Sequence, residues 1–336
     1  MSVTPQTPER VLIVKLSSLG DVIHTLPVAM DIQRAFPNAQ IDWVVERGFA
    51  PLVARCQAVS RVLAIDLRRW RQQPFSSTTR EQWQSFRHDL NQHAYDAVLD
   101  LQGLTKSAWV SWLARVTPHG KRYALGNRTD GSGYERPTRW VADVAIAMEP
   151  HSHALVRGRD MASRALGYVY EPRPHFGLHA PTPQPLASRD VVLVHGTSRA
   201  DKEWPLAHWV ALGQRLQSAG YAIKLTHGNP AEHERAQRLA DALPGSEVWP
   251  ALSLDQVAQR LAQSAGVIGV DSGLSHLAVA LDLPHVQLYN FDTAWRTGPL
   301  GVAHQQAVYA QPVPTVDQVW DAWQACCQAH VMETIA

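Results

Sequence analysis

Asp21 carries a carboxylate, a group that can take part in catalysis, and it lies in a loop at the end of a predicted strand. It lies in the segment Lys15–His24, which follows the apolar run Val11–Val14, and the preceding Gly20 permits a turn of the backbone. Its loop lies at the carboxyl end of the first expected strand, where ligands of parallel sheets bind, and this position favours a functional role. The same carboxylate could instead cap the helix that the next residues are expected to form.

The segment Val267–His276 predicts a strand, a tight turn and then a helix. Amides at a helix N-terminus suit phosphate, and Gly273 allows a ligand to approach the backbone closely. Asp271, at the end of the strand, could accept hydrogen bonds from sugar hydroxyls or only cap the helix. We expect a phosphate to face the amides of Ser272, Gly273 and Leu274.

Two more segments of the second half carry polar groups after apolar runs. Thr197 and Ser198 offer hydroxyls and amides, and Lys202 offers the positive charge that a leaving diphosphate needs. Lys202 could equally pair with a neighbouring acid in a solvated loop. Glu232 lies just inside an expected helix start, where the helix dipole favours a carboxylate, and it could also hold ribose hydroxyls.

A basic cluster with one aromatic residue, Arg68-Arg69-Trp70-Arg71, follows the apolar run Val62–Ile65. Such a cluster can bind nucleic acid, although most are solvated faces. Its position at the carboxyl end of a strand favours an anionic substrate, and we expect no nucleic-acid partner.

Strands that alternate with amphipathic helices must position these segments. Alternation of this kind predicts parallel sheets covered by helices on both faces, so we expect an α/β protein of two doubly wound domains. Ligands of such sheets bind at the carboxyl ends of the strands, which predicts a site in a cleft between the two domains. The expected strands are Val11–Val14, Ile41–Val45, Val62–Ile65, Ala97–Asp100, Val191–His195, Ala222–Thr226, Glu247–Trp249, Val267–Val270 and Val286–Tyr289. The expected helices include Arg80–His93, Lys106–Val116, Leu206–Ala219, Ala231–Leu243, Leu254–Ser264, one from Ser272 and a last one at about Thr315–His330.

Five prolines between Tyr170 and Arg189 exclude a helix or a central strand there. The predicted organisation is therefore an N-terminal domain over residues 1–175, a proline-rich linker over 176–189 and a C-terminal domain over 190–314. The length of 336 residues agrees with two domains at ~150 residues each.

Charge divides along the same line. Residues 1–175 contain 22 Lys and Arg against 16 Asp and Glu, whereas residues 176–336 contain 9 against 14, although the net charge of the whole chain is only +1.

No stretch approaches the ~18 apolar residues of a membrane span, and the polar first nine residues do not resemble a signal peptide. Three cysteines predict neither a disulfide framework nor a zinc site. We expect a cytoplasmic protein.

Patterns for several other chemistries are missing. The sequence contains no H-E-x-x-H, no G-x-S-x-G, no G-x-x-x-x-G-K-[ST] and no G-x-G-x-x-G. A dehydrogenase or nucleotide-sugar epimerase would need a dinucleotide loop, and a periplasmic-type sugar-binding protein would need a signal peptide. We expect no metal site and no cofactor.

Four separated motifs occur in order: VLIVKLSSLGDVIHTLP, DLQGLTKSA, HGTSRADKEWP and GVDSGLSHLAVAL. In these motifs the chain closely resembles the ADP-heptose:lipopolysaccharide heptosyltransferases of glycosyltransferase family 9, over roughly Arg10 to Met332. The RRWR cluster resembles the members that add the first heptose of the inner core. Members that act on an already heptosylated acceptor are the alternative. One departure is YNFDTA from Tyr289 onward, where family members often have Y-G-x-T-D-P; the change alters a donor-side loop at Asn290–Thr293.

The resemblance implies a GT-B fold of two Rossmann-like domains, with the last helix (315–336) packing back towards the first domain. It implies inverting, metal-independent transfer of heptose from ADP-L-glycero-β-D-manno-heptose to Kdo2-lipid A. A lipid acceptor implies peripheral contact with the cytoplasmic face of the inner membrane.

The resemblance also implies roles for single residues. Asp21 would be the general base. The donor would bind to Thr197, Ser198, Lys202, Glu232, Asp271, Ser272, Gly273, Leu274 and His276. The acceptor would bind to Lys15, Arg68, Arg69, Arg71, Lys106 and Arg157.

Overall fold

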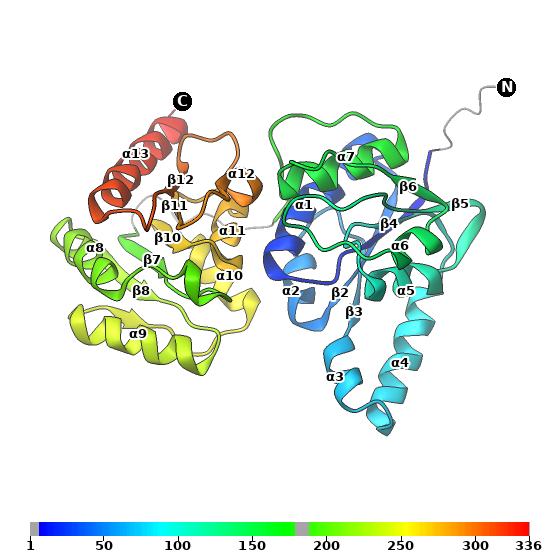
Figure 1. Cartoon of the computed structure of the whole chain (residues 1–336), viewed down its shortest axis with the longest axis horizontal. Helices are drawn as coiled ribbons and strands as arrows, with labels where there is room; N and C mark the ends of the chain where they lie inside the picture. The colour runs from blue at the N-terminus through cyan, green and yellow to red at the C-terminus, as the bar shows by residue number, and fades with distance from the viewer. Residues whose placement is uncertain (1–6, 179–187, 336) are drawn as a thin grey trace. The chain divides into compact units, whose positions relative to one another are not determined.

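Two parallel sheets, each covered by helices, organise the chain (Figure 1). The structure is a computed structural model that describes residues 7–178 and 188–335. It divides into two compact units, Met1–His179 and Ala180–Ala336.

The sheet of the first unit has six parallel strands with the two most buried at its centre. β1 pairs in parallel with β2 on one side and with β4 on the other, so the strand order reverses between β1 and β4. In spatial order the strands are β3 (Arg61–Ile65), β2 (Gln40–Glu46), β1 (Arg10–Val14), β4 (Tyr95–Asp100), β5 (Val116–Leu125) and β6 (Val144–Ile146). Such a reversal is where ligands bind in sheets of this kind.

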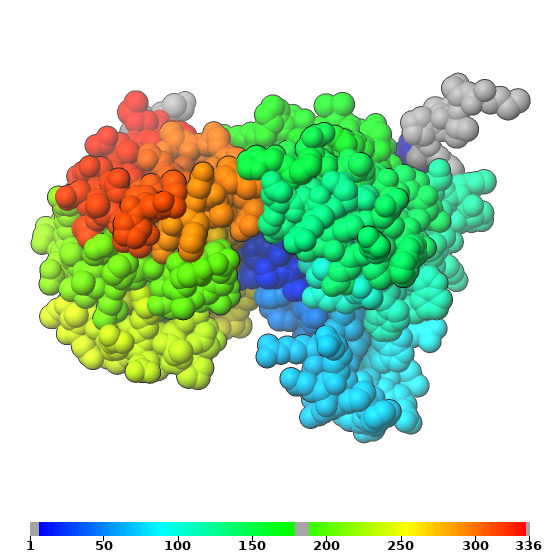
Figure 2. Space-filling view, in the orientation of Figure 1, coloured from blue at the N-terminus to red at the C-terminus, as the bar shows by residue number. Residues whose placement is uncertain are grey.

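The helices of the first unit connect and cover these strands. They are α1 (Leu19–Ala35), the 3-10 turn η1 (Arg47–Phe49), α2 (Ala50–Val53), α3 (Leu67–Gln72), α4 (Ser77–Leu90), α5 (Thr105–Leu113), α6 (Pro137–Val141) and α7 (Ala154–Leu166). The helices α3 and α4 form a hairpin, in light blue to cyan, that projects from the rest of this unit (Figure 2). Trp70 closes the hairpin, because its ring packs edge-on against Trp83 and Phe86 of α4.

The second unit repeats the architecture. Its strands, again all parallel, are in spatial order β12 (Gln305–Tyr309), β11 (His285–Tyr289), β10 (Gly266–Val270), β7 (Asp190–Val194), β8 (Ala222–Leu225) and β9 (Glu247–Val248). The order reverses between β7 and β10, which pair in parallel. Its helices are η2 (Ala200–Lys202), α8 (Leu206–Ser218), α9 (Pro230–Ala242), α10 (Leu254–Ala262), α11 (Gly273–Ala280), α12 (Ala294–Thr297) and α13 (Val316–Ile335).

The structure confirms the two doubly wound α/β units and the strands expected from sequence. The predicted helix Lys106–Val116 was wrong at its end, because Ala114 is extended and Val116 begins β5. Three strands, β5, β6 and β12, were not predicted. Half of β5 consists of Pro118-His119-Gly120-Lys121-Arg122, which has no apolar alternation, and only its last residues are buried.

The proline-rich segment begins against the first unit. Gly177 accepts a hydrogen bond from the amide of Gln57 at 2.9 Å, and Leu178 bridges to Cys56. Pro181, Pro183 and Pro185 of the predicted linker lie outside the described residues. The last helix, α13, packs on α8, β11 and β12 of the second unit, and its approach to the first unit stays a prediction.

Across residues 7–178 and 188–335, no helix is long and apolar enough to cross a membrane.

Candidate functional site

Asp21 occupies the third position of α1, immediately after β1 and beside the reversal of the first sheet. Its Oδ2 accepts hydrogen bonds from the amide of Ser18 at 3.0 Å and from the hydroxyl of Ser18 at 2.9 Å. Asp21 therefore caps α1 together with Ser18, which confirms the helix-capping role that the sequence left open. It also remains 39% exposed, with Oδ1 facing Lys15, so the capping role leaves one oxygen for another partner.

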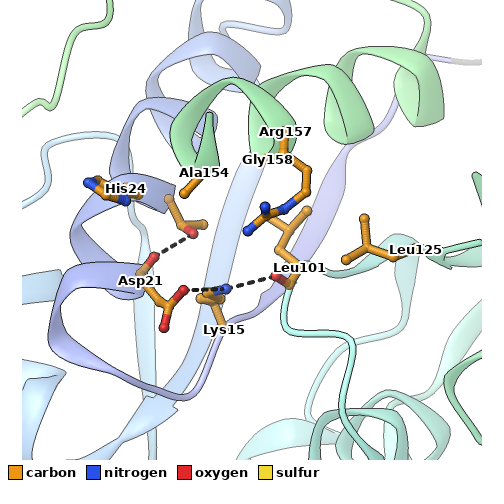
Figure 3. Close-up of a pocket in the computed structure, with 9 residues that line it drawn as sticks. Lys15, Asp21, His24, Leu101, Leu125, Ala154, Arg157 and Gly158 are labelled. Atoms are coloured by element: carbon orange, nitrogen blue, oxygen red, sulfur yellow. Dashed lines mark hydrogen bonds and ion pairs between the residues drawn. The ribbon is translucent and has the colours of Figure 1, made fainter. Parts of the chain in front are cut away.

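Lys15 sets the charge next to Asp21. Its Nζ lies 3.5 Å from Asp21 Oδ1 and donates to the carbonyl of Leu101 at 3.0 Å (Figure 3). Burial lowers the pKa of Lys15, although Asp21 counteracts this. Burial raises the pKa of Asp21, but the charge of Lys15 and the two Ser18 donors outweigh it and the pKa is lowered overall. Asp21 is thus a carboxylate at neutral pH.

Arg157 reaches the same place from α7, which packs on α1. Its side chain points into the pocket beside Lys15 and Leu101 (Figure 3), and one of its nitrogens donates to Thr129 Oγ1 at 3.1 Å. Arg157 is only 8% exposed and Lys15 only 5%. Two nearly buried cations beside one partly exposed carboxylate suit an anionic ligand that carries a hydroxyl.

A cavity of about 290 Å³ opens above these groups. Besides Lys15, Asp21 and Arg157, its lining comprises Ser17, Ser18, Leu101, Gln102, Leu104, Leu125, Gly131, Ser132 and Gly133. Lys106 joins the rim, because its Nζ donates to Ser17 Oγ at 2.7 Å. The structure therefore brings Asp21, Lys15, Lys106 and Arg157 together, and their roles as base and acceptor site stay predictions.

The three arginines of the RRWR cluster lie elsewhere in the unit. Arg68, Arg69 and Arg71 are exposed on α3, while Trp70 between them is 7% exposed and donates to Gln82 Oε1 at 2.9 Å. None of the three arginines lines either of the two cavities at Asp21. Their role towards the acceptor stays a prediction.

Gln102 is a residue of this site that we did not predict, although it lies in the quoted motif DLQGLTKSA. Its Oε1 accepts from the amides of Leu16 at 3.0 Å and Ser17 at 3.1 Å, which fixes the loop that leads to Ser18. The fully buried Asp100 holds Gln102 in turn, accepting from its amide at 3.0 Å. Burial raises the pKa of Asp100 to about 6. The sequence signal for this role was the position of Asp100 and Gln102, two polar residues at the end of the buried strand β4.

We expect Gln102→Ala to lower kcat by roughly 10- to 100-fold, because the loop loses two hydrogen bonds and Ser18 no longer fixes Asp21. The Michaelis constant for the ADP-heptose donor should not change, since Gln102 lies in the first unit and the residues predicted to bind the donor lie in the second. Gln102→Glu keeps an acceptor oxygen and should restore most of kcat. Steady-state kinetics of both variants measure this; equal losses in both would assign Gln102 a purely structural role.

Asp271 is the centre of the polar cluster in the second unit, at the end of β10 and beside the reversal between β7 and β10. Lys202 Nζ donates to its Oδ2 at 2.5 Å, and His276 Nε2 lies 3.4 Å from its Oδ1. Burial raises the pKa of Asp271, but His276 and Lys202 outweigh it, so the pKa lies well below its usual range. Lys202 does pair with a neighbouring acid, and that acid is itself a predicted site residue.

The start of α11 lies next to this ion pair. Ser272 is the N-cap residue, and its Oγ is buried and makes no hydrogen bond within the described residues. The first amides of a helix have no partner inside the helix, so Gly273 and Leu274 present donors at this end. Thr197, after β7, donates to the carbonyl of Asp271 at 3.3 Å. Lys202, Thr197 and the helix start thus lie together around Asp271.

Glu232 and Ser198 occupy the neighbouring loops. Glu232 Oε2 accepts from the amide of Gly228 at 2.7 Å, and a Cβ on Gly196 would lie only 2.7 Å from Glu232 Cδ. Glycine at position 196 therefore allows Glu232 to approach the loop after β7. Ser198 is exposed. Asn290 lies in the loop Asn290–Thr293, whose sequence differs from the usual family pattern. It donates to the carbonyls of Asp201 at 3.2 Å and Glu203 at 2.9 Å and so holds the loop that carries Lys202.

In residues 7–178 and 188–335, no group of three or more His, Cys, Asp or Glu side chains is arranged to hold a metal ion.

Comparison with known proteins agrees with these motifs. Residues 83–319 match the family model described as "Glycosyltransferase family 9 (heptosyltransferase)". Lipopolysaccharide heptosyltransferase 1 of Escherichia coli K12 is 41% identical over 288 residues, which is 83% of this chain and 87% of that protein. The Pseudomonas aeruginosa protein of the same name is 39% identical over 304 residues, covering 87% and 81%.

A solved structure gives the same result for the fold. The structure "E. coli heptosyltransferase WaaC with ADP" matches 97% of this chain and 100% of its own, at 35% identity and a TM-score of 0.80. This confirms the expected GT-B type of fold with two Rossmann-like domains. The chain is a glycosyltransferase, and it belongs to family 9, the heptosyltransferases of lipopolysaccharide biosynthesis.

Proposed function

We propose that this enzyme transfers L-glycero-D-manno-heptose from ADP-heptose to a Kdo residue of Kdo2-lipid A, with inversion and without a metal ion. One observation carries the proposal: Asp21 faces a cavity together with the nearly buried cations Lys15 and Arg157. Kdo carries both a carboxylate, which the cations would bind, and a hydroxyl, which Asp21 would deprotonate. The relative with ADP bound supports the nucleotide part of the donor.

The acceptor hydroxyl attacks the anomeric carbon of the heptose in a single displacement. The new carbon–oxygen bond forms as the bond to the diphosphate breaks, and the hydroxyl proton passes to Asp21. Asp21 has a low pKa and is a weak base, but little basicity is needed when the proton leaves late in an oxocarbenium-like transition state. Arg157 and Lys15 would hold the acceptor by its anionic group.

The diphosphate is the leaving group, and its developing charge requires positive partners. Lys202 and the amides at the start of α11 would supply them, with Thr197 and Ser198 beside them. Lys202 would then exchange Asp271 for a phosphate oxygen, which leaves Asp271 able to accept from heptose hydroxyls. Glu232 would hold the ribose of the adenosine. These partners would take the place of the cation that other transferases use.

We expect Lys202→Ala to weaken ADP binding by roughly 10- to 100-fold, since a hydrogen bond to a charged group contributes about 1.5–3 kcal/mol. Lys224→Ala is the matched control, because Lys224 also pairs with an acid, at 2.7 Å from Glu247 Oε2, but lies on β8. Isothermal titration with ADP measures both affinities. An unchanged affinity in Lys202→Ala would remove Lys202 from the diphosphate site.

The function itself is tested by incubating the enzyme with ADP-heptose and Kdo2-lipid A and measuring the mass of the lipid. The proposal expects a gain of one heptose. A parallel incubation uses an acceptor that already carries a heptose, which tests the alternative activity. A gain on the second acceptor alone would reassign the enzyme to that later step.

A further inference from the structure

Thr129, in the loop between β5 and α6, is polar but only 2% exposed. Its Oγ1 accepts a hydrogen bond from Arg157 at 3.1 Å and lies 2.7 Å from Ser132 Oγ, which in turn donates to the carbonyl of Thr129 at 3.1 Å. Because each hydroxyl has one proton, the order that satisfies every group runs from the guanidinium to Thr129, on to Ser132 and back to that carbonyl. Thr129 thus links Arg157 to a hydroxyl that lines the cavity at Asp21.

The backbone on both sides of Thr129 is held by the segment that leads into α7. The side chain of Asn127 donates to the carbonyl of Met148 at 2.9 Å and accepts from the amide of Met148 at 2.7 Å. The amide of Asp130 donates to the carbonyl of Pro150 at 2.8 Å. The loop and the helix that carries the guanidinium are therefore anchored on the same stretch of chain, and the Thr129 hydroxyl has a fixed position beside that helix.

A fixed hydroxyl matters to Arg157 because a guanidinium stands at the end of a long side chain with many rotatable bonds. Its N–H groups form a rigid planar fork, so a hydrogen bond to one nitrogen also sets the direction of the others. Arg157 points into the pocket beside Lys15 (Figure 3). The direction of the fork then decides how a carboxylate can bind there, next to Asp21.

We propose that Thr129 is a positioning residue for the acceptor, because its hydroxyl holds the Arg157 guanidinium in the orientation that binds the acceptor carboxylate beside Asp21. Thr129 itself lines neither cavity at Asp21 and acts through Arg157. The inference rests on the proposed function, in which Arg157 binds the acceptor by its anionic group. It adds that the loop between β5 and α6 sets the angle at which that group is received.

Thr129→Val tests this, since valine has nearly the same shape but no hydroxyl. We expect the Michaelis constant for Kdo2-lipid A to rise roughly tenfold, because a hydrogen bond to a charged group is lost, while kcat and the Michaelis constant for ADP-heptose change little. Thr129→Ser keeps the hydroxyl and should restore the parent value. Thr117→Val is the matched control: Thr117 Oγ1 also bonds a charged group, Asp96 Oδ1 at 3.0 Å, but it lies at the opposite end of β5. Steady-state kinetics of the three variants measure the effect.

A double-mutant cycle separates positioning from a general effect on the fold. In an Arg157→Met background, Thr129→Val should raise the acceptor Michaelis constant no further, since the group that it positions is gone. An additional tenfold rise in that background would overturn the inference. So would an unchanged constant in Thr129→Val with wild-type Arg157, or equal losses in Thr129→Ser and Thr129→Val.

A crystal structure of Thr129→Val needs no substrate and keeps the inference apart from the proposed function. We expect the Arg157 guanidinium to leave the position that it has in the parent chain. An unmoved guanidinium would overturn the inference. Failure of the proposed function shows differently, because the parent chain itself would then transfer no heptose to Kdo2-lipid A.

Discussion

Asp21→Asn should lower kcat by a factor of roughly 10² or more while ADP binding persists. Asparagine retains an oxygen that can accept from the amide and hydroxyl of Ser18, so the start of α1 keeps its cap. It cannot take a proton from the acceptor hydroxyl. This substitution therefore separates the capping role seen in the structure from the proposed role of Asp21 in proton transfer.

Turnover with ADP-heptose and acceptor measures the loss, and titration with ADP shows that the donor site is intact. Thermal unfolding should match the parent chain, because the cap and the packing of α1 are kept. Near-normal turnover would falsify the assignment of Asp21 as the base and leave it a capping residue.

Arg159→Met should destabilise the first unit by roughly 3–5 kcal/mol, the range found when one partner of a buried ion pair is removed. Arg159 on α7 donates to both carboxylate oxygens of Asp31 on α1, at 2.7 and 2.9 Å. It also donates to the carbonyl of Glu171 at 2.7 Å, and its guanidinium lies 4.1 Å from the ring centroid of Tyr170. Methionine would leave the Asp31 carboxylate buried without this partner.

The free energy of unfolding in urea measures the effect, on the transition of the first unit. Arg34→Met is a matched control, since Arg34 on α1 pairs with Glu171 at 2.6 Å but both side chains are more than half exposed. A surface pair of this kind contributes about 0–1 kcal/mol. Arg159→Met/Asp31→Leu should recover much of the loss, because no unpaired charge remains buried. A loss in Arg159→Met no larger than the control's would contradict the prediction.

The Arg159–Asp31 ion pair also matters for the cavity at Asp21, because α7 carries Arg157 two residues before Arg159. Docking of α7 on α1 is what brings the Arg157 guanidinium to the cavity at Asp21. The buried ion pair thus joins the two helices whose residues Asp21 and Arg157 line the cavity.

Much of the fold followed from sequence because its signals are local. Apolar runs such as Val11–Val14 become central parallel strands, which are buried on both faces and need no alternation. The positions of Asp21 and Asp271 followed as well. Asp271 comes directly after β10, Asp21 lies at the start of the helix that follows β1, and the carboxyl ends of parallel strands bear the ligand sites. By contrast, β5 and β6 lie towards or at the sheet edge, where little burial is required and no pattern marks them.

Tertiary structure decided which of these residues meet. Asp31 and Arg159 are 128 positions apart, and Lys202 and Asp271 are 69 apart, so no local pattern could pair them. The hydrogen bonds of Gln102 to the loop before Asp21 likewise depend on β1 and β4 being neighbours. Sequence alone determined the types of the reacting groups and the strand ends that carry them. The ion pairs and hydrogen bonds that set their charge and orientation arise only when the sheet order and helix packing bring distant segments into contact.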